Sequence, residues 1–128
     1  MNKDELKRRT KEFAHKCVKL AARLPDTSLG KHVRNQLTRA STSVAANYRA
    51  ACLGQTKPVF IAKISIVIEE ADECGFWLEF ALDEKLLDSE LINPLLKEAN
   101  ELTSIFIASR KTAEKSIQRQ QSTINNQQ

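Results

Sequence analysis

The sequence predicts an all-α protein, an antiparallel up-down bundle of four helices. Apolar residues recur at alternating three- and four-residue steps in four successive segments, which is the period of an amphipathic helix. Helix-stopping or helix-capping residues separate these segments, so the connections are short. Gly and Pro number three each, too few for the turns of a many-stranded sheet. Four helices with short connections pack as an up-down bundle.

The first two helices are bounded by clear start and stop signals. The first is stopped by Pro25; the second begins at Thr27 or Ser28, either a good N-cap, and ends near Gly54. The apolar stripe of the first consists of Leu6, Phe13, Cys17, Leu20 and Leu24. The stripe of the second consists of Val33, Leu37, Ala40, Val44, Tyr48 and Ala51.

The third helix has the strongest periodic signal. Thr56 can cap it, and Pro58 falls in the first turn, where a missing N–H costs little. Its stripe is an unbroken a/d series formed by Phe60, Ile64, Val67, Ala71, Cys74, Leu78 and Ala81.

The start of the fourth helix is ambiguous. Asp88 or Ser89 can cap it with Pro94 inside, or Asn93 can cap it with Pro94 at the first position. Its stripe consists of Leu91, Leu95, Ala99, Leu102, Phe106, Ser109 and Ala113. We expect residues 1–115 to form the bundle. Residues 116–128 are rich in Gln, Asn and Ser, and we expect this tail to be frayed or disordered.

The bulk composition favours a cytoplasmic protein. A chain of 128 residues is long enough for one domain with a real core. The apolar runs are too short to span a bilayer, and no signal-peptide block opens the chain, so we expect no membrane partner. The cysteines number three and are widely spaced, which is typical of free thiols in a reducing compartment.

Charge is sorted along the chain. Residues 1–53 carry 12 Lys and Arg against 4 Asp and Glu, whereas residues 54–109 carry 4 against 11. Oppositely charged helices attract each other, and basic surface is left for an anionic partner. Phosphate binding needs only such charge density. The candidate nucleic-acid-binding residues lie on the first two helices: Lys7, Arg8, Lys11, Lys16, Lys19, Arg23, Lys31 and Arg34. The alternative is a solvated face that only aids solubility.

A polar stripe runs beside the apolar stripe of the second helix. It consists of Gln36, Arg39, Ser43 and Asn47 and continues to Ala50. Few long charged residues surround it, so we expect another helix of the bundle or a second subunit to cover it. Glu73 is a candidate partner for Asn47 or Arg39. Alternatively, Ser43 and Asn47 satisfy one another and the nearby backbone.

The chain offers little that points to catalysis. Glu69, Asp72 and Glu73 share one helical face and could share a cation. A di-iron bundle, however, needs a Glu-x-x-His pair on each of two helices, and neither His15 nor His32 completes one. No phosphate-binding loop or nucleophile constellation is present in the sequence. We therefore expect no enzyme activity, no metal and no cofactor.

Several runs resemble the bacterial four-helix bundle protein family, whose members are also called 23S rRNA intervening-sequence proteins. The similarity covers roughly residues 5–115. The runs that carry it are Gln36–Ala50, Phe60–Lys63, Glu69–Glu73, Phe76–Glu79 and the opening segment Phe13–Pro25.

The resemblance implies a left-handed antiparallel bundle that assembles into a ring-like homopentamer. The biochemical function of most members is unknown. The accessory protein of diversity-generating retroelements belongs to a related branch and binds nucleic acid through a basic surface, which is an analogy only. This chain departs from many relatives at Ala45, where they have Pro, and at Ala50 and Ala51, where they have an acid and Gly. We therefore expect a straighter second helix.

Two functional hypotheses follow. The leading one is a non-catalytic oligomeric adaptor that binds the backbone of structured RNA or DNA through the basic face of the first two helices. The alternative is a protein–protein scaffold that recruits another protein and has no nucleic-acid role.

Overall fold

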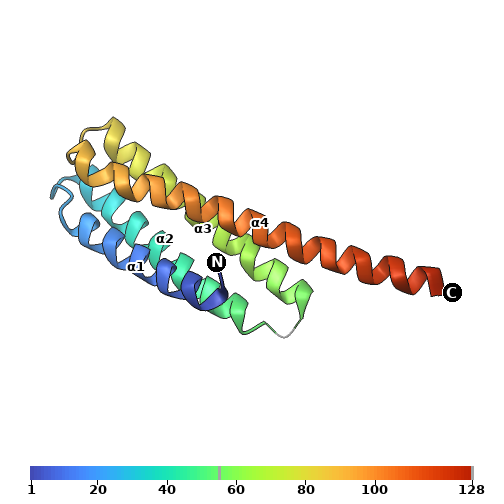
Figure 1. The fold of residues 1–128 in the computed structure, drawn as a ribbon. Helices are drawn as coiled ribbons and strands as arrows, with labels where there is room; N and C mark the ends of the chain where they lie inside the picture. Colours follow the sequence, from blue (N-terminus) through green and yellow to red (C-terminus); the bar gives the residue numbers. More distant parts are fainter. Residues whose placement is uncertain (55, 128) are drawn as a thin grey trace.

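The computed structural model describes residues 1–54 and 56–127, and these residues form four helices and no strand. The helices are α1 (Lys3–Ala22), α2 (Ser28–Cys52), α3 (Lys57–Asp83) and α4 (Ser89–Gln127). Each helix packs beside the next, consecutive helices run in opposite directions, and α1 also contacts α4 (Figure 1). The prediction of an all-helical, four-helix protein is confirmed.

The predicted caps begin α2 and α3. The side chain of Thr27 accepts a hydrogen bond from the backbone N–H of Gly30 at 3.0 Å, and that of Thr56 accepts one from Val59 at 3.3 Å. These N–H groups have no partner within their helix, so the caps stabilise the helix starts. Pro58 lies in the first turn of α3, as predicted.

The core lies between the four helices and is built from the predicted stripes. Every stripe residue of α1 and α2 is buried, as is every one of α3 except the half-buried Phe60. Thr10, which is 0% exposed, fills the gap in the α1 stripe, and its hydroxyl donates to the carbonyl of Leu6 at 2.8 Å. That hydrogen bond removes the cost of burying the hydroxyl.

The start of α4 follows one of the two predicted alternatives. The helix begins at Ser89 and contains Pro94 in its second turn. This register buries Ile92, whereas Leu91, which the sequence placed in the core, is half-buried. The two residues are adjacent and about 100° apart around the helix axis, so the way α4 packs on its neighbours decides which of them is buried.

The C-terminal part of α4 differs from the sequence prediction. Residues 116–127, expected to be frayed or disordered, continue the helix and project beyond the ends of α1, α2 and α3 (Figure 1). Residues 118–126 are all exposed, so packing does not hold them. A helix already nucleated by the packed part of α4 gains one hydrogen bond for each added residue, and Gln is a good helix former.

The third helix is apolar on more than its core side. Val59, Ile66 and Phe76 are 46%, 39% and 51% exposed, although large apolar side chains on a surface helix normally face the core. Among the described residues, no helix carries an apolar stretch long enough to cross a bilayer.

Candidate nucleic-acid interface

Four cations of α1, together with Arg23 at its C-cap, form what we call the outer cationic face. Its residues are all exposed, and they are Arg8, Lys11, Lys16, Lys19 and Arg23. Within residues 1–54 and 56–127, none of the five has a carboxylate at ion-pairing distance. Helical periodicity spreads them over one broad side of α1. Their charged groups therefore face solvent, and the exposed carboxylates of Asp4, Glu5 and Glu12 lie on the same helix.

Two further predicted cations have weak ion pairs. Lys7 Nζ lies 3.6 Å from a carboxylate oxygen of Asp4, and Lys31 Nζ lies 3.8 Å from one of Asp26. The two carboxylates are 93% and 80% exposed. Exposed pairs of this kind contribute little and are screened by salt. Lys7 and Lys31 can therefore exchange these partners for a phosphate.

The eighth predicted cation, Arg34, is engaged within the fold. Its Nη2 donates to the carbonyl of Leu24 at 2.8 Å and its Nε to that of Ala21 at 3.3 Å. These carbonyls lie at the C-terminal end of α1, where backbone acceptors lack helical partners. Arg34 therefore stabilises the connection between α1 and α2 through these hydrogen bonds. The number of basic residues in the sequence does not indicate this role.

A groove of about 550 Å³ runs between α1 and α2. It is lined by Lys7, Lys11, Ala14, His15 and Val18 of α1 and by Thr42, Ala45, Ala46 and Arg49 of α2. We call it the α1–α2 groove. Arg49 was not among the predicted candidates; the antiparallel packing brings the end of α2 beside the start of α1. Arg49 can be identified as a groove residue from the pairing of α1 with α2, but not from the residue spacing within α2.

The polar stripe of α2 faces α3 of the same bundle. Arg39 forms ion pairs with Glu73 and with Glu70, the latter at 3.1 Å between Nη1 and Oε2. Of the two predicted partners for Glu73, the structure places Arg39 there. Asn47 donates to the hydroxyl of Ser43 at 2.8 Å and to its carbonyl at 3.0 Å, so this pair is satisfied locally. Gln36 is half-buried.

The acidic segment of α3 is partly used by these contacts. Glu70 and Glu73 pair with Arg39, whereas Glu69 and Asp72 are exposed. In the part of the chain that the structure describes, no group of three His, Cys, Asp or Glu side chains is arranged to hold a metal ion.

The two core thiols are poor nucleophiles in the folded chain. Cys17 and Cys74 are both 0% exposed. Burial raises the pKa of Cys17 to about 12, and it raises the pKa of Cys74 as well. Both groups are protonated at neutral pH, and the thiol form is unreactive. Cys52 is half-buried.

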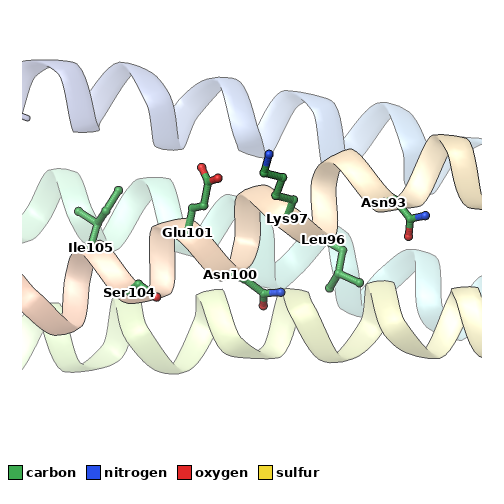
Figure 2. Close-up of a pocket in the computed structure, with 7 residues that line it drawn as sticks. All are labelled: Asn93, Leu96, Lys97, Asn100, Glu101, Ser104 and Ile105. Atoms are coloured by element: carbon green, nitrogen blue, oxygen red, sulfur yellow. The ribbon is translucent and has the colours of Figure 1, made fainter.

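A hollow of about 810 Å³ lies on the outer side of α4 (Figure 2). All seven of its lining side chains come from this one helix. Lys97 and Glu101 point to one side of α4, and Asn93, Leu96 and Asn100 point to the other (Figure 2). An active site brings polar groups from several elements onto one point. This hollow brings together groups from α4 alone.

Fold and surface together define a four-helix protein with a cationic side on α1 and α2. The model of the 23S rRNA-intervening sequence protein family matches residues 2–108, and the chain belongs to this family. Its structure is similar to that of a protein of unknown function from the S23 ribosomal protein family of Bacteroides thetaiotaomicron. The TM-score is 0.79 at 28% identity, over 87% of this chain and 99% of that chain. No curated protein matches the chain.

Proposed function

We propose that the chain is a non-catalytic, self-associating cytoplasmic adaptor that binds the phosphate backbone of structured RNA or DNA through α1 and α2. The observation that carries the proposal is the outer cationic face, whose five exposed cations form no ion pair among the described residues, although Glu12 lies one turn from Arg8 and Lys16. When protein cations that lack an ion pair bind phosphates, they displace the counterions condensed on the nucleic acid, and this release favours binding. The interaction is independent of base sequence.

The placement of the acids supports one binding orientation. The exposed carboxylates Glu69, Asp72 and Glu79 lie on α3, whereas the exposed acids of α1 (Asp4, Glu5 and Glu12) are outnumbered there by Lys and Arg. Like charges repel phosphates, so a nucleic acid approaches from the α1 side.

Self-association is part of the same proposal. Val59, Ile66 and Phe76 are large apolar side chains exposed on α3, and side chains of this kind are available for a protein–protein contact. We propose that α3 contributes to a contact between copies in a left-handed, ring-like homopentamer, the assembly expected from the family resemblance. A ring repeats the outer cationic face around its circumference.

Fluorescence anisotropy with a labelled structured RNA and a labelled duplex DNA, titrated across salt, tests the binding. We expect the logarithm of the affinity to fall linearly with the logarithm of salt concentration. The variant Lys16→Glu, Lys19→Glu, Arg23→Glu should keep the fold and lose most of the affinity. The matched control reverses three exposed cations of α4, Lys111, Lys115 and Arg119. If the α1 variant keeps its affinity and the α4 control loses it, the binding site lies on α4 instead.

A protein–protein scaffold is the second candidate. It is favoured by the aromatic cluster of Phe76, Trp77 and Phe80, in which the Phe76 and Trp77 rings lie 4.9 Å apart. An aromatic cluster with exposed edges is typical of a binding surface for another protein. Failure of the wild-type chain to bind either nucleic acid at low salt would leave this candidate as the better one.

A further inference from the structure

We infer that one end of the bundle binds a small amphipathic anion, an alkyl chain that carries a single carboxylate. The site is a pocket of about 710 Å³ with lining residues from all four helices, and we call it the end pocket. It lies where α1 and α3 begin, α2 ends and α4 starts to project beyond the other helices (Figure 1). Pockets of this size between the helices of a bundle are common ligand sites. The end pocket shares no lining residue with the outer cationic face or the α1–α2 groove, so this inference is independent of the proposed function.

The lining of the end pocket is largely apolar and continues the core of the bundle. Its large apolar side chains include the buried Leu6 and Tyr48 and the half-buried Phe60 and Ile105. Ala108 of α4 adds a methyl group. Phe60 and Ile105 both pack against the core, so an alkyl chain in contact with them extends the core. Each methylene group buried in this way strengthens binding roughly fourfold.

Two ammonium groups lie at the end pocket and come from different helices. Lys3 Nζ of α1 lies 5.4 Å from the centroid of the Phe60 ring of α3, and Lys57 Nζ of α3 donates a hydrogen bond to the Ser116 hydroxyl of α4. Both lysines are exposed, and within the described residues neither has a carboxylate at ion-pairing distance. An ammonium group has three N–H donors, so each lysine keeps donors for a carboxylate.

The described residues that line the end pocket include no acid. At the start of α1, Asp4 pairs with Lys7, and Glu5 accepts a hydrogen bond from the side chain of Asn2. On α4, Glu114 pairs with an arginine of its own helix. The charge of the pocket lining is therefore positive, and it complements an anion. A carboxylate accepts hydrogen bonds from the lysines while its alkyl chain contacts the apolar lining.

Isothermal titration calorimetry with octanoate, butanoate and 1-octanol at neutral pH tests the chemistry of the ligand. We expect octanoate to bind, because it has both an alkyl chain and a charge. Butanoate and 1-octanol should each bind roughly tenfold more weakly or worse, because the first has a shorter chain and the second has no charge.

The lysines are tested by removing their charge. We expect the double variant Lys3→Gln, Lys57→Gln to bind octanoate roughly tenfold more weakly than wild type does. The matched control, Lys16→Gln with Lys19→Gln, removes two exposed charges from α1 outside the end pocket and should bind octanoate as wild type does.

A second variant fills the end pocket and keeps its charge. Ala108 is exposed, so Ala108→Phe should fold normally while its ring occupies part of the pocket and prevents octanoate binding. Ala62→Phe, at an exposed position of α3 outside the end pocket, is the matched control and should bind octanoate as wild type does.

Four outcomes would overturn the inference. They are wild-type protein that binds no octanoate, 1-octanol that binds as tightly as octanoate, octanoate binding that is unchanged in both pocket variants, and a changed molecular mass in Ala108→Phe. The last would make the end pocket a contact between copies. Sedimentation with phosphatidylglycerol vesicles that the double lysine variant loses would also overturn it, because the lysines would then contact a membrane surface rather than a free carboxylate.

Discussion

At the residue scale, Arg9 connects the two helices that pack least extensively against each other. Its Nη2 lies 2.6 Å from Glu98 Oε1 and 2.7 Å from Glu101 Oε2, and its Nε donates to Glu98 Oε2 at 2.8 Å. The hydrogen bonding that Arg9 donates to the Glu98 carboxylate is the main cause that raises the pKa of Arg9. A fork-shaped contact of this kind fixes α1 on α4 with defined geometry.

We expect Arg9→Ala to lower the free energy of unfolding by about 1–2 kcal/mol, because it removes a partly buried, bidentate pair and leaves two carboxylates close together. Urea unfolding followed by circular dichroism measures it. The neighbouring Arg8→Ala is the control, since Arg8 is exposed and has no ion pair among the described residues. Equal midpoints for the two variants would show that the Arg9 contact does not stabilise the fold.

At the residue scale, the sequence predicts local contacts but not contacts between helices. The capping role of Thr27 was predictable because the hydrogen bond spans three residues. The engagement of Arg34 by Ala21 and Leu24 was not, because it depends on how α1 and α2 are joined in space. A count of basic residues treats Arg34 and Arg23 alike, although their surroundings differ.

At the scale of the element, two glycines differ in how much space surrounds them. A methyl group on Gly30, in the first turn of α2, would lie 1.9 Å from the carbonyl oxygen of Pro25. A methyl group on Gly75, inside α3, would meet only Asn100 Oδ1, at 3.7 Å. The first position needs glycine because backbone approaches backbone. The second tolerates a side chain.

We expect Gly30→Ala to destabilise the protein by roughly 1–3 kcal/mol, because the connection before α2 must shift. Gly75→Ala should stabilise it by roughly 0.5–1 kcal/mol, because alanine restricts the unfolded chain and favours helix. Thermal unfolding of the two variants beside wild type measures both effects. A destabilised Gly75→Ala variant would indicate that α3 is packed more tightly at this point than the geometry indicates.

At the scale of the whole molecule, charge and apolar surface are segregated. The outer cationic face lies on α1, and the exposed apolar side chains Val59, Ile66 and Phe76 lie on α3. This separation allows one side of the chain to contact other copies while another side meets phosphates.

We expect Ile66→Glu and Phe76→Glu each to lower the molecular mass measured by multi-angle light scattering, because a carboxylate in a buried apolar contact is costly. Ser104→Glu, on the exposed side of α4, is the control and should leave the mass unchanged. Wild-type protein that is monomeric at high concentration would contradict the proposed self-association. An unchanged mass in both α3 variants would place the contact between copies elsewhere.

The sequence by itself determined the four helices, three of their four core stripes and the caps Thr27 and Thr56. The reason is that helical period and capping act over three or four residues. The register of Ile92 in the core, the helical extension of α4, the role of Arg34 and the inclusion of Arg49 in the α1–α2 groove were decided by tertiary structure. Each depends on which helix surfaces meet or which helix part is already anchored, and such contacts join residues far apart in the chain.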